Sequence, residues 1–356
     1  MKEFLNFDFN LIGRQSKPSL EKLQGRSLLL TGGTGFFGKW ILGFLDYANS
    51  HCDLNLKIHV LSRNPSSFLT DFPDFQARGI QFITGDIREF KWTKKTDYVI
   101  HAATDASASL NQEQPSQMFD VIVNGTKNLL ENCKQSKPEK ILIVSSGAVY
   151  GKQESQQIHQ PDETLTAPET HLSSSAYGEG KRVSELMGTF HFKETGQLVS
   201  FARCFSFVGP YLPLDRHFAV GNFINDCLSG RDILITGDGT PCRSYMYPTD
   251  LVTWLLKILT FGENLRSYNV GSEESVNIAA LAQSVSEAWF ELSGQLIQPR
   301  LLVKPKNDAS ISRYVPETER AKKELGLSLQ IPLREALLRT FKWHASQRKI
   351  PLIKTD

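Results

Sequence analysis

The sequence of 356 residues has few cysteines, almost no net charge and no long apolar run. Its five cysteines are odd in number and form no Cys-x-x-Cys pair, which argues against a disulfide framework or a zinc site and favours a reducing compartment. With 40 Lys and Arg against 38 Asp and Glu, the net charge is +2, so no basic surface for nucleic acid is expected. No apolar run approaches the roughly 20 residues of a membrane helix, so a membrane is not an expected partner either.

The first 25 residues lack the apolar core of a secretion signal and contain several charged side chains, among them Lys2, Asp8 and Arg14. We expect residues 1–25 to be an extension that packs on the surface or is partly loose, and the protein to be cytoplasmic. The remaining length is enough for one large domain or two modest ones.

A strand, a glycine-rich turn and a helix follow one another early in the chain. The leucines at 28–30 predict a buried parallel strand, and residues 39–47 have a helical pattern with one apolar side. Between them, Gly32, Gly35 and Gly38 have the spacing Gly-x-x-Gly-x-x-Gly. Such a turn aims backbone N–H groups and the positive end of a helix at one spot, which suits a pyrophosphate. Gly32 permits the tight turn, Gly35 the approach of phosphates, and Gly38 the packing of helix on strand.

Strands and helices alternate up to about residue 204. The patterns predict strands at 57–62, 80–84, 98–101, 140–145 and 198–203, and helices at 116–134 and 176–194. This alternation predicts an α/β fold, a doubly wound Rossmann sheet whose ligands sit beyond the carboxyl ends of its strands.

The pattern becomes less regular after Gly209-Pro210. We expect helices at 218–228, 250–259, 278–290 and 333–344, strands at 233–236 and 268–271, and a loop over the site at 153–175. The predicted organisation is an N-terminal extension (1–25), a dinucleotide-binding domain (26–204, also receiving 243–271), a substrate-binding region (205–242 and 272–345) and a tail (346–356).

The second strand ends without an acidic residue. An Asp or Glu there would hold the ribose 2′-hydroxyl of NAD, but the chain has Ser62 and Arg63. These two side chains could instead accept a 2′-phosphate, which favours NADP slightly over NAD. Alternatively, Arg63 only stacks on the adenine or faces solvent.

Two segments after the fifth strand carry side chains suited to proton transfer. The first contains Ser146, and the second is Tyr177-Gly178-Glu179-Gly180-Lys181. The spacing i, i+4 places Tyr177 and Lys181 on one face of a helix. A nearby positive charge lowers the pKa of a tyrosine, which would fit Tyr177 to act as a general acid or base near neutral pH. The alternative is an unreactive pair on a surface helix.

Together these segments resemble the extended short-chain dehydrogenase/reductases, a family of nucleotide-sugar epimerases, dehydratases and reductases. The resemblance spans roughly residues 26–340 and includes the segments Gly85-Asp86-Ile87-Arg88, His101-Ala102-Ala103-Thr104, Asn124-Gly125-Thr126, Arg203 to Gly209-Pro210, and Arg243 to Asp250. It implies that the cofactor is bound by Gly32, Thr34, Gly35, Phe36, Phe37, Gly38, Ser62, Arg63, Asp86, Ile87, Ala102, Ala103, Thr104, Asn124, Tyr177 and Lys181.

The resemblance also implies roles in catalysis. Tyr177 would be the acid/base, Lys181 would bind the nicotinamide ribose, and Ser146 would hydrogen-bond a sugar hydroxyl or carbonyl. Hydride would pass between the nicotinamide and a sugar carbon, most often C4, without a metal. The nucleoside-diphosphate sugar would contact Ser146, Gly147, Ser206, Asn222 and Arg243, with the planar Arg243 guanidinium facing the diphosphate. His217 and Phe218 are further candidates for the sugar pocket.

Departures from the family pattern narrow the reaction. Gly147 and Ala148 stand where the 4,6-dehydratases have Asp-Glu, and where the decarboxylases have Glu at the second position. Neither residue can move a proton, whereas water elimination needs a separate acid and base, so 4,6-dehydration is disfavoured. The segment from Tyr177 to Lys181 resembles Tyr-x-Glu-Gly-Lys of the decarboxylases, which keeps decarboxylation open. Ser206 stands where the family usually has Asn.

We therefore expect an NAD(P)-dependent epimerase or 4-keto-sugar reductase that serves polysaccharide or glycoside assembly. The helices at 116–134 and 176–194 resemble the pair that forms the family's dimer interface, so a homodimer is expected. A remote alternative is a non-catalytic redox sensor with the same fold. It is disfavoured because Ser146, Tyr177 and Lys181 are all present.

Overall fold

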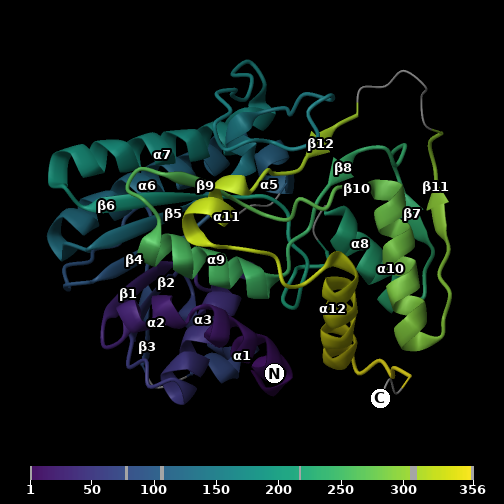
Figure 1. Cartoon of the computed structure of the whole chain (residues 1–356), viewed down its shortest axis with the longest axis horizontal. Coiled ribbons are helices and arrows are strands. Elements are labelled where there is room, and N and C mark those ends of the chain that lie inside the picture. The colour runs from purple at the N-terminus through teal and green to yellow at the C-terminus, as the bar shows by residue number, and fades with distance from the viewer. Residues whose placement is uncertain (1, 77–78, 105–107, 216–217, 305–310, 354–356) are drawn as a thin grey trace.

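The computed structural model describes residues 2–76, 79–104, 108–215, 218–304 and 311–353. Its centre is a seven-stranded parallel sheet in the order β3-β2-β1-β4-β5-β6-β9. Figure 1 labels these strands. The strands are β1 (Ser27–Thr31), β2 (Lys57–Ser62), β3 (Ile80–Thr84), β4 (Tyr98–His101), β5 (Lys140–Ser146), β6 (Leu198–Cys204) and β9 (Ser267–Val270). The predicted doubly wound α/β fold is confirmed.

Helices cover both faces of this sheet because successive strand residues point to opposite sides. Leu29 belongs to the core beneath α6 (Pro115–Ser136), whereas Leu28 and Leu30 belong to the core beneath α3 (Phe36–His51). Helix α7 (Ala176–Thr195) packs beside α6, and α9 (Pro248–Phe261) packs near α3. Both faces of the strands are therefore buried.

The direction of winding reverses between β1 and β4. The chain runs outward from β1 to β2 and β3, and then returns to place β4 on the other side of β1. The crevice outside the carboxyl ends of these two strands is the usual ligand site of such sheets. The glycine-rich turn after β1 opens into this crevice.

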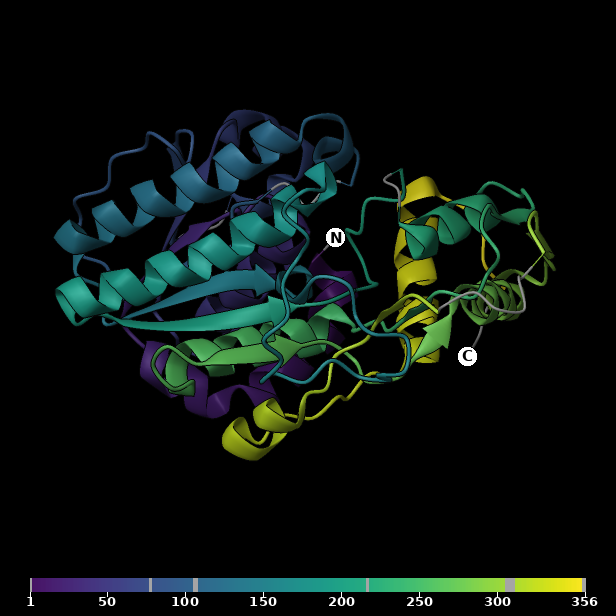
Figure 2. The ribbon, with the colours of Figure 1, turned by 90° about the horizontal axis from the view of Figure 1, so that it is seen from above.

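A second group of elements stands beside the sheet, as Figure 2 shows. It contains the two-stranded sheet β11-β7 and the three-stranded sheet β10-β8-β12. Its elements are α8 (Ala219–Leu228), β7 (Ile233–Ile235), β8 (Cys242–Arg243), β10 (Val276–Asn277), α10 (Ile278–Ser293), β11 (Pro299–Leu301), β12 (Arg313–Tyr314) and α12 (Leu333–Arg348). The four helices predicted after Gly209 are present, but β8, β10, β11 and β12 were not predicted.

Short elements complete the described fold. They are α4 (Pro65–Asp71), η2 (Pro73–Phe75), α5 (Ala108–Glu113), η3 (Gly147–Tyr150), η4 (Ser173–Ser175) and α11 (Glu319–Leu325). Within the described ranges, no helix has both the length and the hydropathy that crossing a membrane requires.

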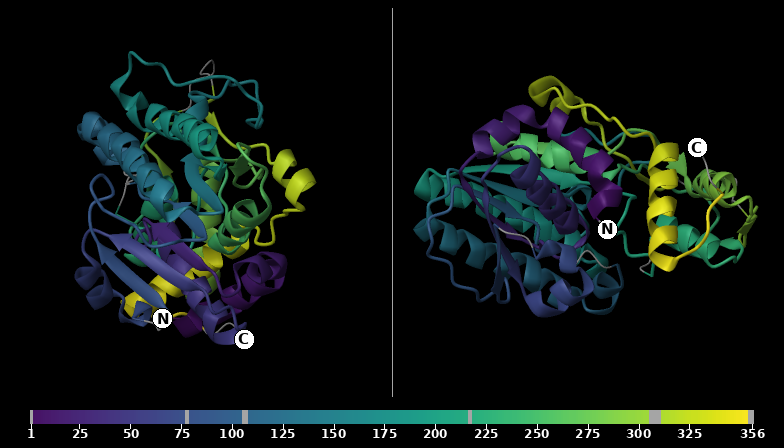
Figure 3. Two further views of the ribbon diagram at one scale, coloured as in Figure 1. Left: turned by 90° about the vertical axis from the view of Figure 1, so that its left-hand side faces the viewer. Right: turned by 90° about the horizontal axis from the view of Figure 1, so that it is seen from below.

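The N-terminal extension is more ordered than expected. It forms η1 (Lys2–Leu5), α1 (Asn6–Gln15) and α2 (Lys17–Leu23), which lie against α3 and α9, as the right-hand view of Figure 3 shows. Leu5, Phe9 and Ile12 are buried, and the Phe9 ring centroid lies 6.0 Å from that of Trp40. Their spacing of i, i+4, i+7 forms one apolar helix face, which is why a segment with many charges packs into the core.

Candidate active site

The turn after β1 forms a tight backbone cradle. Gly32 has φ of 75°, and a Cβ there would lie 2.4 Å from the carbonyl oxygen of Ala102. A Cβ at Gly38 would lie 2.3 Å from the carbonyl oxygen of Gly32. Gly35 is exposed, and no side chain caps the first turn of α3. The cradle therefore excludes side chains while leaving the N–H groups of the helix open, which fits the diphosphate of a dinucleotide.

The residues flanking this cradle are held by β1. The backbone N–H of Ala102 donates to the carbonyl of Thr31, and that of Ala103 donates to the Thr31 hydroxyl. Phe37 packs edge-on against Phe207, with ring centroids 4.8 Å apart. The other predicted residues here, Thr34 and Phe36, are half-buried in the same turn. The predicted cofactor residues that follow β1 and β4, and those in the first turn of α3, thus lie together at the carboxyl ends of these strands.

The end of β2 offers a buried hydroxyl and an exposed cation. Ser62 is buried and pairs in register with Thr84 of β3, whereas Arg63 is exposed. Arg63 lies close enough to Asp86 to help lower the pKa of that carboxyl to about 2, although Arg88 has the larger effect. The cation is thus placed just beyond the carboxyl end of β2.

Asp86 and Asn124 belong to a surface cluster around Arg88. The Arg88 guanidinium donates to Asp86 at 2.9 Å and to Asp120 at 2.7 Å, and Asn124 donates to Asp120 at 2.6 Å. Ile87, by contrast, points inward, since a Cβ at Gly125 would lie 2.9 Å from it. Asn124 therefore belongs to this cluster. Among the described residues, its side chain forms no hydrogen bond with Ser146 or Tyr177.

Lys181 projects from α7 toward the end of β5. Its Nζ donates to the Thr104 hydroxyl and to the carbonyl of Val144, each at 2.8 Å. Burial lowers the pKa of Lys181 to about 8. The Nζ lies 5.9 Å from the centroid of the Tyr177 ring, so the predicted pairing on one helix face is present.

Tyr177 corrects one expectation. Burial raises the pKa of its phenol to about 12, and the hydrogen bond with Ser146 opposes that rise. We expected Lys181 to lower this pKa, but the ammonium is directed to Thr104 and Val144 and does not offset the desolvation of the phenolate. The backbone N–H of Tyr177 donates to Asn111, which fixes the start of the helix.

Ser146 ends β5 and contacts two phenols. Its Oγ accepts a hydrogen bond from the backbone N–H of Ala148 at 3.2 Å and lies 3.2 Å from the hydroxyl oxygen of Tyr314. Tyr177 is its second phenolic partner. Tyr314 was not predicted, because its two-residue strand has no periodicity. Strand β12 is held next to β8 by long-range pairing, in which Tyr314 is in register with Arg243.

The position after Ser146 is filled by an aromatic ring. A Cβ at Gly147 would lie 2.6 Å from Phe205, whose ring centroid is 4.6 Å from that of Tyr314. Ala148 is the next residue. The two positions at which the resemblance implies acids in a 4,6-dehydratase therefore provide no proton-carrying side chain, and Phe205 leaves no room for one at Gly147.

The Glu185 carboxylate on α7 is already engaged in hydrogen bonds within the protein. Glu185 accepts from the Ser145 hydroxyl at 2.5 Å and from two nitrogens of Arg203 at 3.0 and 2.7 Å. Arg203 also donates to the Tyr150 hydroxyl at 2.9 Å. This network is structural, because it fastens α7, β5 and β6 to one another.

The predicted substrate residues are spread more widely. Arg243 lies on β8, where its Nη1 donates to the carbonyls of Cys242 at 2.8 Å and Ser312 at 3.3 Å. Ser206 is half-buried, and its carbonyl accepts from Met246. Asn222 and Phe218 are exposed at the start of α8, and His217 lies outside the described residues. Among these described residues, only three are linked to Tyr314. Ser146 lies beside its hydroxyl and Gly147 lies against Phe205, which packs on its ring. Arg243 is in register with it on the neighbouring strand.

The predicted loop at 153–175 is fastened at its middle. The backbone N–H of Gln160 donates to Val315, and the Asp162 carboxylate accepts from the backbone N–H of Asn269 at 2.7 Å. Burial raises the pKa of Asp162 to about 6, against the attraction of Arg320. The loop thus connects the end of β9 to the segment that carries Tyr314.

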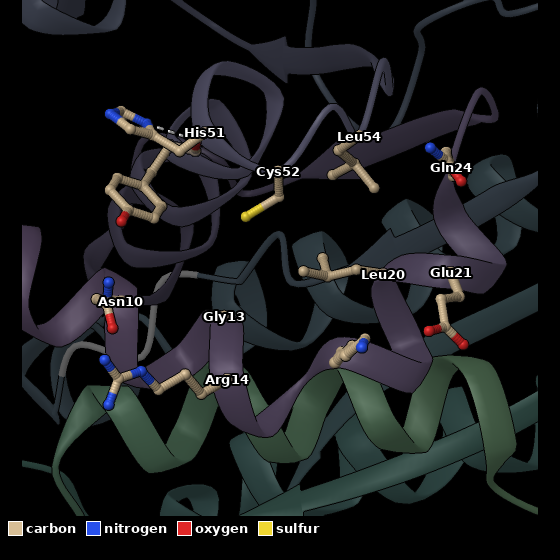
Figure 4. Close-up of a pocket in the computed structure, with 11 residues that line it drawn as sticks. Asn10, Gly13, Arg14, Leu20, Glu21, Gln24, His51, Cys52 and Leu54 are labelled. Atoms are coloured by element: carbon tan, nitrogen blue, oxygen red, sulfur yellow. Dashed lines mark hydrogen bonds between the residues drawn. The ribbon is translucent and has the colours of Figure 1, made fainter.

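A separate cavity of about 430 Å³ lies between α1, α2 and the C-terminal end of α3, as Figure 4 shows. Its lining includes Arg14, Glu21, His51 and Cys52, and none of the predicted site residues. It is therefore distinct from the crevice described above.

Comparisons with known proteins agree with this fold. Residues 28–271 match the model of the NAD dependent epimerase/dehydratase family. UDP-glucuronic acid decarboxylase 6 of Arabidopsis thaliana is 28% identical over 318 residues, covering 87% of this chain and 86% of that protein.

Two solved structures show the same fold. UDP-glucose 4-epimerase of Thermotoga maritima, with UDP-glucose, has a TM-score of 0.74 at 21% identity and covers 90% of this chain and 99% of its own. The dTDP-glucose 4,6-dehydratase DesIV of Streptomyces venezuelae, with NAD and TYD bound, has a TM-score of 0.75 at 21% identity, covering 91% and 98%.

Proposed function

Because the chain belongs to the NAD-dependent epimerase/dehydratase family, we propose that it transfers a hydride between NAD(P) and one carbon, C4, of a nucleoside-diphosphate sugar. It would act as an epimerase or as a 4-keto-sugar reductase. The observation that carries this proposal is the convergence of Ser146, Tyr177 and Lys181 with no proton-carrying side chain at Gly147 or Ala148.

The residues divide the work as follows. The nicotinamide, when bound, supplies the hydride acceptor or donor. Tyr177 takes the proton from the sugar hydroxyl during oxidation and returns it during reduction. Ser146 hydrogen-bonds the same sugar oxygen, and Lys181 orients the ribose. Arg243 is suited to the diphosphate, because a guanidinium binds such oxygens in a bidentate manner.

The cofactor is proposed to be NADP or NAD, with a slight preference for NADP from Ser62 and Arg63. DesIV, a structural relative, binds NAD. Mass spectrometry of the nucleotide released from freshly purified protein tests the choice. Copurified NAD would support an epimerase that recycles its cofactor and would contradict the argument from Arg63. Preferential binding of NADPH by an empty protein would support a reductase.

Tyr177→Phe tests the chemical role directly. The variant should lose turnover while keeping cofactor binding, because it removes only the ionisable hydroxyl. UDP-glucose, UDP-galactose and a dTDP-4-keto-6-deoxy sugar are suitable probes, with products followed by nuclear magnetic resonance. Loss of cofactor binding in this variant would contradict the assigned position of Tyr177.

A second candidate is decarboxylation of a nucleotide-linked uronic acid. The Arabidopsis relative at 28% identity is a UDP-glucuronic acid decarboxylase, and the segment from Tyr177 to Lys181 resembles that group. The first step would again be oxidation at C4, after which the β-keto acid would lose carbon dioxide, C5 would gain a proton and the hydride would return to C4. Formation of a UDP-pentose from UDP-glucuronate would favour this candidate over the main proposal.

We also propose a homodimer through α6 and α7. Phe119 on α6 is 37% exposed, and Leu186 and Phe190 on α7 are 51% and 52% exposed. Exposed apolar side chains on two neighbouring helices are typical of an interface. Light scattering should report a dimer mass, and Phe190→Glu should convert it to a monomer.

A further inference from the structure

The cavity between the N-terminal helices and α3 has an apolar floor and a charged group toward each end. Its volume of about 430 Å³ is within the range of small-molecule sites. Leu20 and Leu54 line it, although they expose only 8% and 1% of their surface. Figure 4 shows these two side chains between Arg14 and Glu21. A ligand that fits this cavity would therefore have an apolar body with a polar group at one end or both.

Arg14 makes its end of the cavity positive. Its guanidinium has several N–H donors, but it forms no hydrogen bond or ion pair with any other described residue. Asn10 lies one helical turn before it on α1 and lines the same end, as Figure 4 shows. Lys17 also lines the cavity, but Glu21 follows it four positions later, so the charges of these two can offset each other. The cation that is left uncompensated is therefore Arg14.

Gly13 leaves the wall beside Arg14 open. A glycine within a helix is destabilising relative to alanine, so its presence in α1 calls for a cause. Its φ is not positive, and a Cβ there would meet a single described atom within 4 Å, Phe44 Cε2 at 3.9 Å. Neither the backbone nor crowding thus requires glycine here. Because Gly13 lines the cavity, a larger side chain at this position would take up cavity volume.

The wall that α3 contributes is fixed by an aromatic stack. The rings of Tyr47 and His51 are 4.2 Å apart between centroids at an interplanar angle of 13°. His51 Nδ1 lies 3.0 Å from the Tyr47 carbonyl oxygen, and since a carbonyl only accepts, Nδ1 carries the hydrogen. Both residues line the cavity. This wall is therefore preformed, and a ligand need not order it on binding.

We propose that this cavity binds a small molecule with a carboxylate or phosphate head group and an apolar body. Arg14 and Asn10 hold the head group, because a planar guanidinium pairs with two oxygens of either anion. The apolar body covers Leu20 and Leu54. The inference goes beyond the proposed function and does not depend on it, since none of the predicted site residues lines the cavity.

The test measures dissociation constants for benzoate, phenyl phosphate and benzamide by ligand-observed nuclear magnetic resonance, with the full-length protein at fixed ionic strength. The two anions distinguish a carboxylate from a phosphate, and benzamide is the neutral analogue of benzoate. We expect at least one anion to bind more tightly than benzamide. Arg14→Ala should weaken the binding of that anion about tenfold and change that of benzamide about twofold or less.

Two further variants locate the binding. Lys22→Ala is the matched control, because it also removes one cation from the N-terminal helices, but Lys22 does not line the cavity and its Nζ donates to the carbonyl of Thr260 at 3.4 Å. It should leave all three dissociation constants unchanged. Gly13→Leu should weaken the binding of every probe that the cavity holds, since the new side chain takes up its volume.

Several results would overturn the inference. If the anions bind wild type and Arg14→Ala equally well, they bind elsewhere, for example at the cradle around Gly35. Equal losses in Lys22→Ala and Arg14→Ala would show an effect of net charge alone, and unchanged binding by Gly13→Leu would show that the probes are outside the cavity. Equal affinity for the anions and benzamide, or no saturable binding of either anion up to about 10 mM, would also contradict it.

Discussion

Adding one methyl group at Gly147 should disturb the site through its packing. A Cβ at this position would lie 2.6, 2.7 and 2.8 Å from three carbons of the Phe205 ring, whereas ordinary contacts begin near 3.4 Å. The Phe205 ring would have to move by several tenths of an ångström, and it packs against the Tyr314 ring at an interplanar angle of 36°. Overpacking of this kind costs about 1–3 kcal/mol of unfolding free energy.

The assay combines thermal unfolding with turnover. At about 2 °C for each kcal/mol in a chain of this size, Gly147→Ala should lower Tm by roughly 2–6 °C. Its kcat should fall as well, because movement of Phe205 carries the Tyr314 ring away from Ser146. Gly237→Ala is the matched control, since a Cβ at Gly237 meets no atom within 4 Å and its φ is not positive.

A double variant makes the prediction sharper. Phe205→Leu removes the ring that the new methyl group meets, so Gly147→Ala combined with Phe205→Leu should be less destabilised than the sum of the two single changes. Additive effects would show that the methyl group does not act through Phe205. A Gly147→Ala variant as stable and active as wild type would refute the packing argument.

Three further predictions concern other parts of the fold. Asp8→Asn should reduce the unfolding free energy, measured by chemical denaturation, by about 3 kcal/mol, because it breaks the buried ion pair of Asp8 with Arg339. Glu335→Gln, at the exposed partner of Arg339, should reduce it by about 1 kcal/mol or less in the same assay. The pKa of Asp162 is raised from 3.8 to about 6, so its contribution to stability is present below the lower value and is lost as pH rises through the higher one. Asp162→Asn should therefore gain stability relative to wild type as pH rises from about 4 to about 6, and a constant difference in Tm would contradict the assignment. Arg63→Ala should weaken NADPH binding about tenfold and NADH binding about twofold or less by calorimetry, and equal losses would show that Arg63 does not contact a 2′-phosphate.

Local patterns in the sequence were enough to predict the sheet and the relative placement of some candidate site residues. The strand at 28–30 with Gly32, Gly35 and Gly38 carries its own signal, since buried apolar runs and tight turns are local properties. The pair Tyr177 and Lys181 was placed correctly on one helix face, again a local property. The pKa of Tyr177 was predicted in the wrong direction, because desolvation depends on the residues that cover the phenol rather than on its neighbours in the chain.

What the sequence did not reveal depends on long-range contacts. Tyr314 is brought to Ser146, 168 positions earlier, by a two-residue strand that exists only through its pairing with β8. The fit of Phe205 over Gly147 is likewise invisible without coordinates. The N-terminal helices were different, because the spacing of Leu5, Phe9 and Ile12 was a usable signal that the charged residues around them obscured.

The most direct measurement is the position of solvent deuterium in the product of a reaction run in deuterium oxide. Hydride transfer at C4 alone exchanges no carbon-bound hydrogen with water, whereas 4,6-elimination and decarboxylation both include protonation of C5. We predict that nuclear magnetic resonance of the sugar product will show no deuterium on carbon. Deuterium at C5 would contradict the proposal that Ser146, Tyr177 and Lys181 act at a single sugar carbon.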